Sequence, residues 1–117
     1  MNNYIFLDEL KNKIIKFIYD EDYTNYKYIN LDHSNEYVFH IEDEEFEIDN
    51  FIIFVTFDVE IVTNTDAGDY YTPSYVHISS EYINITSIIY YDDEEIEHKI
   101  PYKIVKKFEN DINNALY

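Results

Sequence analysis

The spacing of apolar side chains changes twice along this chain of 117 residues, and that change restricts the folds open to it. Residues 3–19 carry apolar side chains three and four positions apart, which predicts an amphipathic helix with Asn2 or Asn3 as its N-cap. From Tyr23 onward the spacing becomes two, which is the period of a strand. Spacings of three and four return in residues 101–116 and predict a second helix.

The middle of the chain predicts an antiparallel sheet of five or six strands. Alternating apolar residues at 26–30 and 37–41 indicate a hairpin with a turn at residues 32–35. Another turn is expected at Asp43–Glu44, and a long strand pattern then covers residues 45–62.

The apolar phase of that long pattern moves from even to odd positions near Asn50, which predicts either a bulge or a strand break there. Residues 63–75 hold the only Gly and one of the two Pro, and predict an extended loop. A second long strand is expected at residues 76–91, with a phase change near Tyr82–Ile83. An acidic turn and a short return strand at residues 96–100 follow.

The fold predicted from this order is a single α+β domain over residues 1–117, with both helices on one face of the sheet. Hydrophobic residues make up 46% of the chain and aromatics 19%, which suffices for a core despite the charge. Because the chain has no Cys, it has no disulfide, thiolate zinc site or cysteine nucleophile. One Gly excludes a glycine-rich phosphate loop. No membrane span or signal peptide is evident, so a soluble, intracellular protein is expected.

Acidic residues are concentrated in one part of the chain. The net charge is −17, and residues 28–98 contain 18 of the 25 Asp and Glu residues but no Lys or Arg. Such a charge opposes contact with nucleic-acid phosphates or anionic membranes and favours basic protein surfaces or cations. We therefore expect the counter-charges to come from a partner protein.

Paired carboxylates suggest acid–base catalysis or calcium binding only weakly. Asp58 and Glu60 adjoin the most apolar stretch, but their alternation with apolar residues places them on the solvent face. Residues 20–24 start like an EF-hand loop, yet Asn25 stands where the loop requires Gly and Leu31 where it requires Glu. No nucleophile with an adjacent base is recognisable, so an enzyme is not expected.

Histidines likewise give no complete ligand set. His40 and Glu42 share one face of a predicted strand and would need two further ligands to hold a metal ion. His98 is expected to pair with Glu97 or Glu95. We predict neither a metal site nor a cofactor.

The strongest candidate surface is a row of carboxylates. On a strand, Glu45, Glu47 and Asp49 share one face at steps of about 6.6–6.8 Å, on the order of two rises of a nucleic-acid strand. Together with the acidic runs at residues 42–45 and 92–97, they predict a surface that mimics a phosphate backbone.

A tyrosine-rich loop is the second candidate surface. Tyr70, Tyr71 and Tyr75 surround Pro73, and they either form a protein-binding patch or fold back onto the sheet. The predicted partner-binding residues are Glu42, Asp43, Glu44, Glu45, Glu47, Asp49, Asp92, Asp93, Glu94, Glu95, Glu97, Tyr70 and Tyr71.

The chain resembles the small inhibitors encoded by phages and mobile elements of AT-rich bacteria, among them anti-CRISPR proteins and antirestriction DNA mimics. The resemblance lies in its small size, its lack of Cys, its richness in Asn, Ile, Lys and Tyr, and the acidic runs at residues 42–47 and 92–97. Residues 68–73, followed by a strand, an acidic turn and a helix, also resemble small phage proteins.

This resemblance implies an inhibitor of a CRISPR effector or restriction enzyme, acting in the bacterial cytoplasm on the basic nucleic-acid channel of its target. It implies no direct contact with nucleic acid or membrane. The alternative is a non-enzymatic phage binding or assembly protein that uses the sheet and the tyrosine loop. An enzyme or metal protein is the third possibility.

Overall fold

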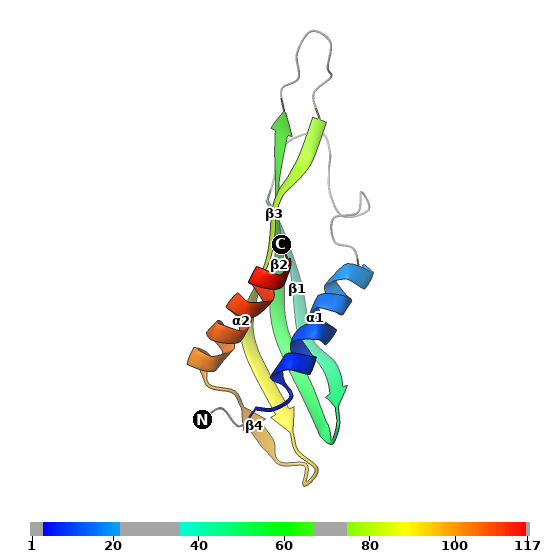
Figure 1. Ribbon diagram of the computed structural model, residues 1–117, viewed down its shortest axis with the longest axis vertical. Coiled ribbons are helices and arrows are strands. Elements are labelled where there is room, and N and C mark those ends of the chain that lie inside the picture. The colour runs from blue at the N-terminus through cyan, green and yellow to red at the C-terminus, as the bar shows by residue number, and fades with distance from the viewer. Residues whose placement is uncertain (1–3, 22–35, 67–74, 117) are drawn as a thin grey trace.

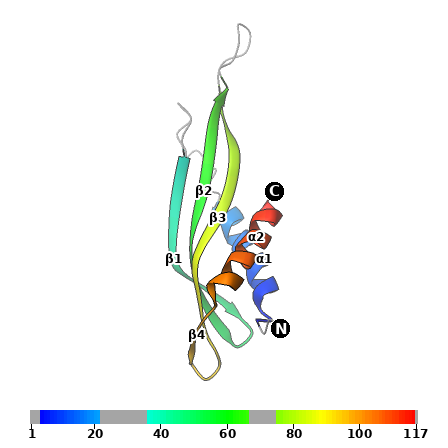
Figure 2. The same cartoon turned by 90° about the vertical axis from the view of Figure 1, so that its left-hand side faces the viewer.

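The computed structural model describes residues 4–21, 36–66 and 75–116 as an α+β fold with a four-stranded antiparallel sheet (Figure 1). The elements, in chain order, are α1 (Leu7–Glu21), β1 (Glu36–Ile48), β2 (Phe51–Asp66), β3 (Tyr75–Tyr91), β4 (Glu97–Lys99) and α2 (Tyr102–Leu116). The strands are neighbours in the order β1-β2-β3-β4. Both helices lie on one face of the sheet, as the sequence predicts (Figure 2).

The number of strands differs from the prediction. Four strands occur among residues 36–66 and 75–116, whereas the sequence predicts five or six. The predicted strand at residues 26–30 and the turn at residues 32–35 lie outside the described residues. The two strands predicted on either side of Asp43–Glu44 are a single strand, β1.

A β-bulge occupies the place in β1 where the sequence predicts a turn. The register shifts between Ile41 and Glu44, so that Glu42 and Asp43 lie opposite the single residue Thr56 of β2. Asp43 adopts a φ of 50°, a left-handed conformation that a short polar side chain tolerates, and its N–H donates to Thr56 Oγ1 at 3.1 Å. The extra residue moves the buried side chains of β1 from odd-numbered to even-numbered positions, an effect that a turn can also have. Because β1 pairs with β2 on both sides of Asp43, the turn predicted there is wrong.

The discontinuity predicted near Asn50 is a strand break with a two-residue turn. Ile48 pairs with Phe51, and Asp49 and Asn50 connect them. Asp49 has a φ of 52°, which gives the tight turn its left-handed residue. The long strand pattern is therefore divided between the end of β1 and most of β2.

β2 is the central strand of the core. Its odd-numbered side chains from Ile53 to Thr63 are at most 1% exposed. Each helix packs against this face with a stripe of side chains three or four positions apart. These stripes are Leu10, Ile14 and Ile18 on α1, and Val105, Phe108 and Ile112 on α2. Full burial of one such side chain contributes about 1.5–3 kcal/mol, so the stripes hold the helices on the sheet.

The register of β3 shifts on both sides of the predicted phase change at Tyr82–Ile83. Its pairing with β2 shifts at Ser79 and again at Thr86. After the second shift the core-facing residues pass from Ile85 to Ile88. Because a register shift turns the following side chains to the opposite face, the phase of β3 changes at these two positions and not at the predicted one.

The first helix starts later than predicted. α1 begins at Leu7, and the C=O of Phe6 accepts the hydrogen bond of the Leu10 N–H at 2.8 Å. The predicted start at residue 3, with Asn2 or Asn3 as N-cap, is therefore wrong. The Phe6 ring instead packs among aromatic rings of the sheet, which accounts for its place in the apolar pattern.

α2 also closes the edge of β3 beyond the short strand β4. The carboxamide of Asn113 accepts from the Ile83 N–H at 2.8 Å and donates to the Ile83 C=O at 3.1 Å. The Glu109 carboxylate accepts from the Ile85 N–H at 2.6 Å, and the Lys106 ammonium donates to the Ile85 C=O at 3.1 Å. Side chains of the helix thus satisfy backbone groups that a further strand would otherwise bind.

The strands are much longer than the helices that cover them. β2 has 16 residues and a length of about 53 Å, whereas α2 has 15 residues and a length of about 22 Å. Figure 1 shows the β2–β3 hairpin extending beyond both helices. Neither α1 nor α2 is long and apolar enough to cross a membrane.

Candidate functional site

The face of the sheet opposite the helices, called the open face below, carries both acidic and apolar side chains. Because the odd-numbered residues of β2 are buried under the helices, its even-numbered residues lie on the open face, and the register identifies their neighbours. Its residues are Glu36, Val38, His40, Glu45, Glu47, Ile52, Phe54, Thr56, Asp58, Glu60, Val62, Ser80, Tyr82, Asn84, Ser87, Ile89, Tyr91, Glu97 and Lys99. This set has six carboxylates and one Lys.

Two rows of the open face cross all four strands near the β1–β2 turn. They are Glu47–Ile52–Tyr91–Glu97 and Glu45–Phe54–Ile89–Lys99. Neighbouring strands lie about 4.8 Å apart, so each row is about 14 Å wide. Carboxylates occupy the β1 side, apolar side chains the middle, and one carboxylate with one ammonium group the β4 side.

A hollow opens in the middle of these rows. It has a volume of about 330 Å³ and is lined by Asp43, Phe54, Ile89, Tyr91 and Glu97. The Phe54 and Tyr91 rings meet edge to face, with centroids 5.8 Å apart. Its floor is therefore apolar, and carboxylates lie at its rim.

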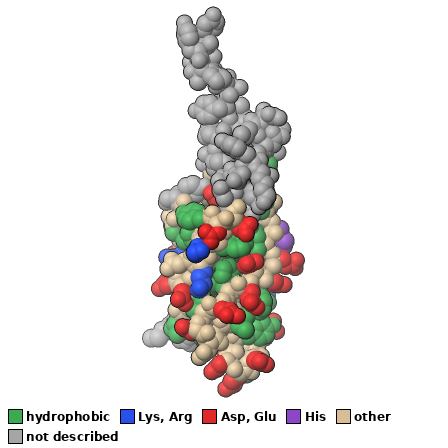
Figure 3. Space-filling view, turned by 90° about the vertical axis from the view of Figure 1, so that its right-hand side faces the viewer, with side chains coloured by type: hydrophobic (Ala, Val, Ile, Leu, Met, Phe, Trp, Pro, Cys, Tyr) green, Lys and Arg blue, Asp and Glu red, His purple; other side chains and the backbone are tan. Residues whose placement is uncertain are grey.

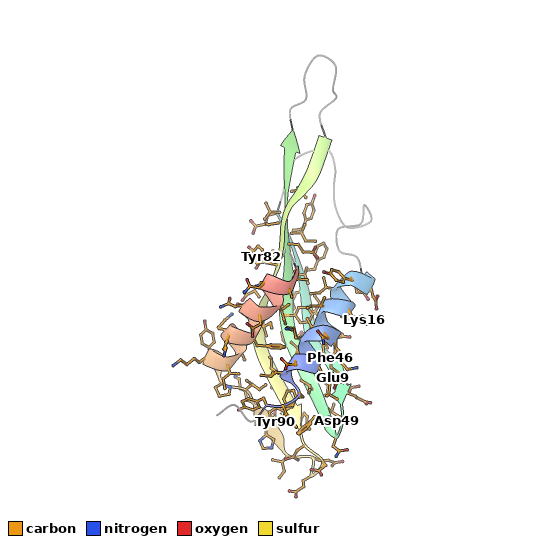
Figure 4. All side chains as sticks on the ribbon, viewed as in Figure 1. Glu9, Lys16, Phe46, Asp49, Tyr82 and Tyr90 are labelled. Carbon is orange, nitrogen blue, oxygen red and sulfur yellow. The ribbon has the colours of Figure 1, made fainter. Side chains whose placement is uncertain are left out.

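The acidic run of β1 is divided between the two faces of the sheet. Glu45 and Glu47 are exposed on the open face, as the sequence predicts. Glu44, which is also among the predicted partner-binding residues, pairs with the core residue Val55 and is half-buried on the helix face. Asp49 lies in the turn at the end of the sheet, where Figure 4 labels it. Of the three residues predicted to form a row, Glu45 and Glu47 therefore lie on β1, whereas Asp49 lies in the turn.

Positive charge from α1 lies beside this acidic run. Lys13 and Lys16 line a second hollow, of about 480 Å³, together with Glu45 and Glu47. Figure 3 shows Lys side chains among the carboxylates on the side of the molecule that carries α1. These Lys side chains lie near the acidic run, and the ammonium group of Lys16 pairs with Asp20 at 2.7 Å.

One carboxylate of the second acidic run organises the β3–β4 turn. Asp92 Oδ1 accepts from the N–H groups of Glu94 at 3.0 Å and Ile96 at 3.1 Å, and Asp92 Oδ2 lies 2.9 Å from His98 Nε2. These hydrogen bonds, the one with His98 first, lower the pKa of Asp92 below its ordinary 3.8. The predicted partners of His98, Glu97 and Glu95, are therefore wrong, because Asp92 takes that place.

The other acidic residues of the β3–β4 turn point to solvent. Asp93, Glu94, Glu95 and Glu97 are exposed. Figure 1 shows that this turn and the β1–β2 turn lie at the same end of the sheet. The fold therefore brings together two acidic runs that lie more than 40 residues apart in the sequence.

Further along the open face, a histidine and several carboxylates interact. His40 Nδ1 lies 2.6 Å from Asp58 Oδ1, and this contact, with added attraction from Glu42, raises the pKa of His40 above 6.5. Partial burial, followed by the negative charge of Asp58, raises the pKa of Glu60 above 4.5. Burial and the nearby Glu60 raise the pKa of Tyr82 as well. These groups extend the acidic surface along β1, β2 and β3.

Two other sequence-based candidates have structural roles or lie outside the described residues. Asp20, from the EF-hand-like segment, pairs with Lys16 at 2.7 Å. Within the described ranges, no group of three or more His, Asp or Glu side chains can hold a metal ion. Tyr70 and Tyr71 lie outside those ranges. Both ends of the predicted loop belong to strands, because β2 continues to Asp66 and β3 begins at Tyr75.

Sequence reasoning missed the apolar floor between the two acidic runs. The signal was present, since Ile52 and Phe54 occupy even positions of a strand whose odd positions are already apolar. Such a stretch predicts burial on both faces. In the structure the helices cover only one face, and Ile52 remains 40% exposed on the other.

Comparison of the chain with models of known families, with curated proteins and with solved structures found no match.

Proposed function

We propose that this protein is a non-enzymatic inhibitor whose open face binds the basic nucleic-acid surface of a partner protein and keeps DNA or RNA away from it. The observation that supports this proposal is the assembly of two acidic runs at one end of one sheet face. Glu45 and Glu47 lie on β1, and Glu97 lies about 14 Å away on β4. The exposed acids of the β3–β4 turn adjoin them.

The charge of the molecule suits such a partner. At a net charge of −17, the protein repels phosphates and is attracted to clustered Lys and Arg side chains. Carboxylates at the rim of an interface raise the association rate and make it sensitive to salt. The resemblance to phage inhibitors makes CRISPR effectors and restriction enzymes, in the cytoplasm of a bacterial host, the first partners to test.

The test is a competition assay. A guide-loaded Cas9-type effector and a restriction enzyme are each bound to labelled target DNA, and the protein is added at two ionic strengths. Bacterial proteins captured on the immobilised chain extend the panel. The protein is expected to release labelled DNA from at least one member. The double variant Glu45→Lys/Glu47→Lys is expected to be at least about tenfold weaker, because each reversal places like charge against a basic surface.

A matched control makes the same change of charge on the helices. Glu21 and Asp111 are exposed on α1 and α2, so Glu21→Lys/Asp111→Lys should inhibit like the wild type. Equal inhibition by the wild type and the Glu45/Glu47 variant at low salt contradicts the proposal. Direct micromolar binding of the isolated protein to DNA or RNA in a gel shift contradicts it as well.

The same assay separates the alternative of a phage assembly protein that acts through the tyrosine loop. That alternative predicts active Glu45/Glu47 variants and an inactive Tyr70→Ala/Tyr71→Ala variant. The proposed inhibitor predicts the reverse.

A further inference from the structure

A surface that only imitates phosphates needs no apolar centre. The hollow on the open face nevertheless has Phe54, Ile89 and Tyr91 in its lining, with Ile52 paired with Tyr91 on the adjacent strand. Ile52 is 40% exposed, so apolar area faces solvent between the acidic runs. Apolar surface of this kind, rimmed by polar residues, marks protein interaction sites, and its burial favours binding in a way that salt does not screen.

The width of the sheet at the hollow is close to that of one helix. The rows that contain it span β1 to β4, about 14 Å, and an α-helix with its side chains is about 10–12 Å across. A helix lying along the strands can therefore place one apolar stripe on the floor. Its flanking side chains then reach the two rims.

The rims differ in charge. Asp43, Glu45 and Glu47 lie on the β1 side, whereas Glu97 has Lys99 as its neighbour on β4. Lys and Arg stems are long enough to cover apolar surface while their charged ends reach a carboxylate. The charge of the open face thus favours a helix with basic side chains on the flank that faces β1.

We propose that the hollow binds an amphipathic basic helix of the partner protein, with an apolar stripe on Phe54, Ile89 and Tyr91 and with Lys or Arg side chains against the β1 carboxylates. This inference rests on the proposed inhibitor function and assigns the kind of partner element that the open face binds. Figure 4 shows this end of the sheet from the helix side, with Asp49 labelled at the β1–β2 turn, so the open face lies on its far side.

The experiment uses two synthetic helical peptides of equal length and equal positive charge. One carries a Leu stripe flanked by Lys, and the other carries Ala in place of each Leu, so that charge and helix propensity are kept. Each is titrated into the isotopically labelled protein, and backbone amide shifts are followed by NMR. The Leu peptide should bind at least about tenfold more tightly, with the largest shifts at Phe54, Ile89 and Tyr91.

Two substitutions of apolar residues test the same inference without changing the charge of the protein, and a third substitution tests the effect of charge at the β4 rim. Ile52→Ser should weaken the Leu peptide about tenfold, whereas Ile5→Ser, which changes an 81% exposed side chain on the helix side, should leave it unchanged. Lys99→Glu should tighten binding by a few-fold, because it completes the acidic rim on β4.

The outcomes distinguish this inference from the function on which it rests. Equal affinity for the two peptides, with both lost in the Glu45→Lys/Glu47→Lys variant, overturns the helix site and leaves an acidic inhibitor surface. Shifts confined to other parts of the molecule also overturn the helix site. The competition assay tests the inhibitor function separately. That function fails if labelled DNA stays bound to every partner protein tested.

Discussion

Asp92 and Asp93 are neighbours in the acidic run of the β3–β4 turn, yet they have different roles. Asp92 accepts two backbone N–H groups and contacts His98, whereas Asp93 is exposed. A side chain that accepts backbone hydrogen bonds two and four residues ahead fixes the path of a turn. We therefore assign Asp92 to the fold and Asp93 to the charged surface.

Asp92→Ala should lower the melting temperature by several degrees at pH 6, whereas Asp93→Ala should leave it nearly unchanged. The pKa of Asp92 is lowered in the folded state, so its stabilisation is complete above the ordinary value of 3.8 and is lost as the pH falls through the folded-state pKa. The difference between the two variants should therefore shrink in strong acid. Thermal melts followed by circular dichroism measure it, and equal melting temperatures at pH 6 would contradict this role.

Glu60 illustrates the opposite case, in which ionisation costs stability. Partial burial and the charge of Asp58 raise its folded-state pKa above 4.5, so the folded state holds this proton more tightly than the unfolded state does. The cost of ionisation is absent at pH values below 4.5 and complete above the folded-state pKa.

Glu60→Gln should raise the melting temperature at pH 7 by a few degrees, because the amide carries no charge and removes the cost of ionisation. The gain should disappear at pH 4, where the carboxyl of the wild-type folded state is protonated. The exposed Glu94 supplies the control, since Glu94→Gln should change little at either pH. A gain of equal size at both pH values would show that charge is not its cause.

At the scale of elements, α2 covers one edge of the sheet, whereas one face of the sheet has no helix over it. β4 covers three residues of β3, and side chains of α2 bind the backbone beyond it. A helix that binds a strand edge through its side chains prevents another strand from adding there. In contrast, neither helix covers the open face (Figure 2).

Asn113→Ala should destabilise the protein by about 1–3 kcal/mol, because both backbone groups of Ile83 lose a part-buried partner. The control is Asn114→Ala at the exposed next position of α2, which should be neutral or slightly stabilising because Ala favours helix. Urea unfolding gives the free energies. Amide hydrogen exchange at Ile83 should accelerate in the Asn113 variant alone, and unchanged exchange there would contradict the edge-binding role.

At the scale of the whole molecule, stability and charge act against each other. At a net charge of −17 on 117 residues, the negative side chains repel one another. Ion pairs such as Lys16–Asp20 and Lys106–Glu109 reduce this repulsion locally. Salt screens the long-range repulsion more than the contact pairs, since the screening length is about 10 Å at 0.1 M.

The melting temperature at pH 7 should therefore rise between 0.02 and 0.3 M NaCl, by roughly 4 °C, as about 0.5–1 kcal/mol of repulsion is screened. Lowering the pH from 7 to 5 should act in the same direction. Because the pKa of His40 is raised in the folded state, protonation of His40 stabilises the fold. This stabilisation is complete below pH 6.5 and is lost as the pH rises through the folded-state pKa. Calorimetry at the two salt concentrations measures the effect, and a melting temperature that falls with NaCl would show that ion pairs outweigh repulsion.

The order of helix, strands and helix was predictable from sequence alone, because it depends on local periodicity. Spacings of four at Leu10, Ile14 and Ile18 require a helix to bury them together. Strict alternation from Val55 to Ile61 likewise requires a strand with one buried face. These patterns involve neighbours in the chain, so no knowledge of distant contacts is needed to interpret them.

Only the tertiary structure decides where the acidic side chains point and what lies between them. Acidic residues at a change of phase are compatible with a turn or a bulge, and pairing with Thr56 makes Asp43 a bulge residue. The row from Glu47 through Tyr91 to Glu97 exists because antiparallel register aligns residues more than 40 positions apart. Periodicity carries no information on register, nor on which of two apolar faces the helices cover, since both follow from the packing of the whole sheet.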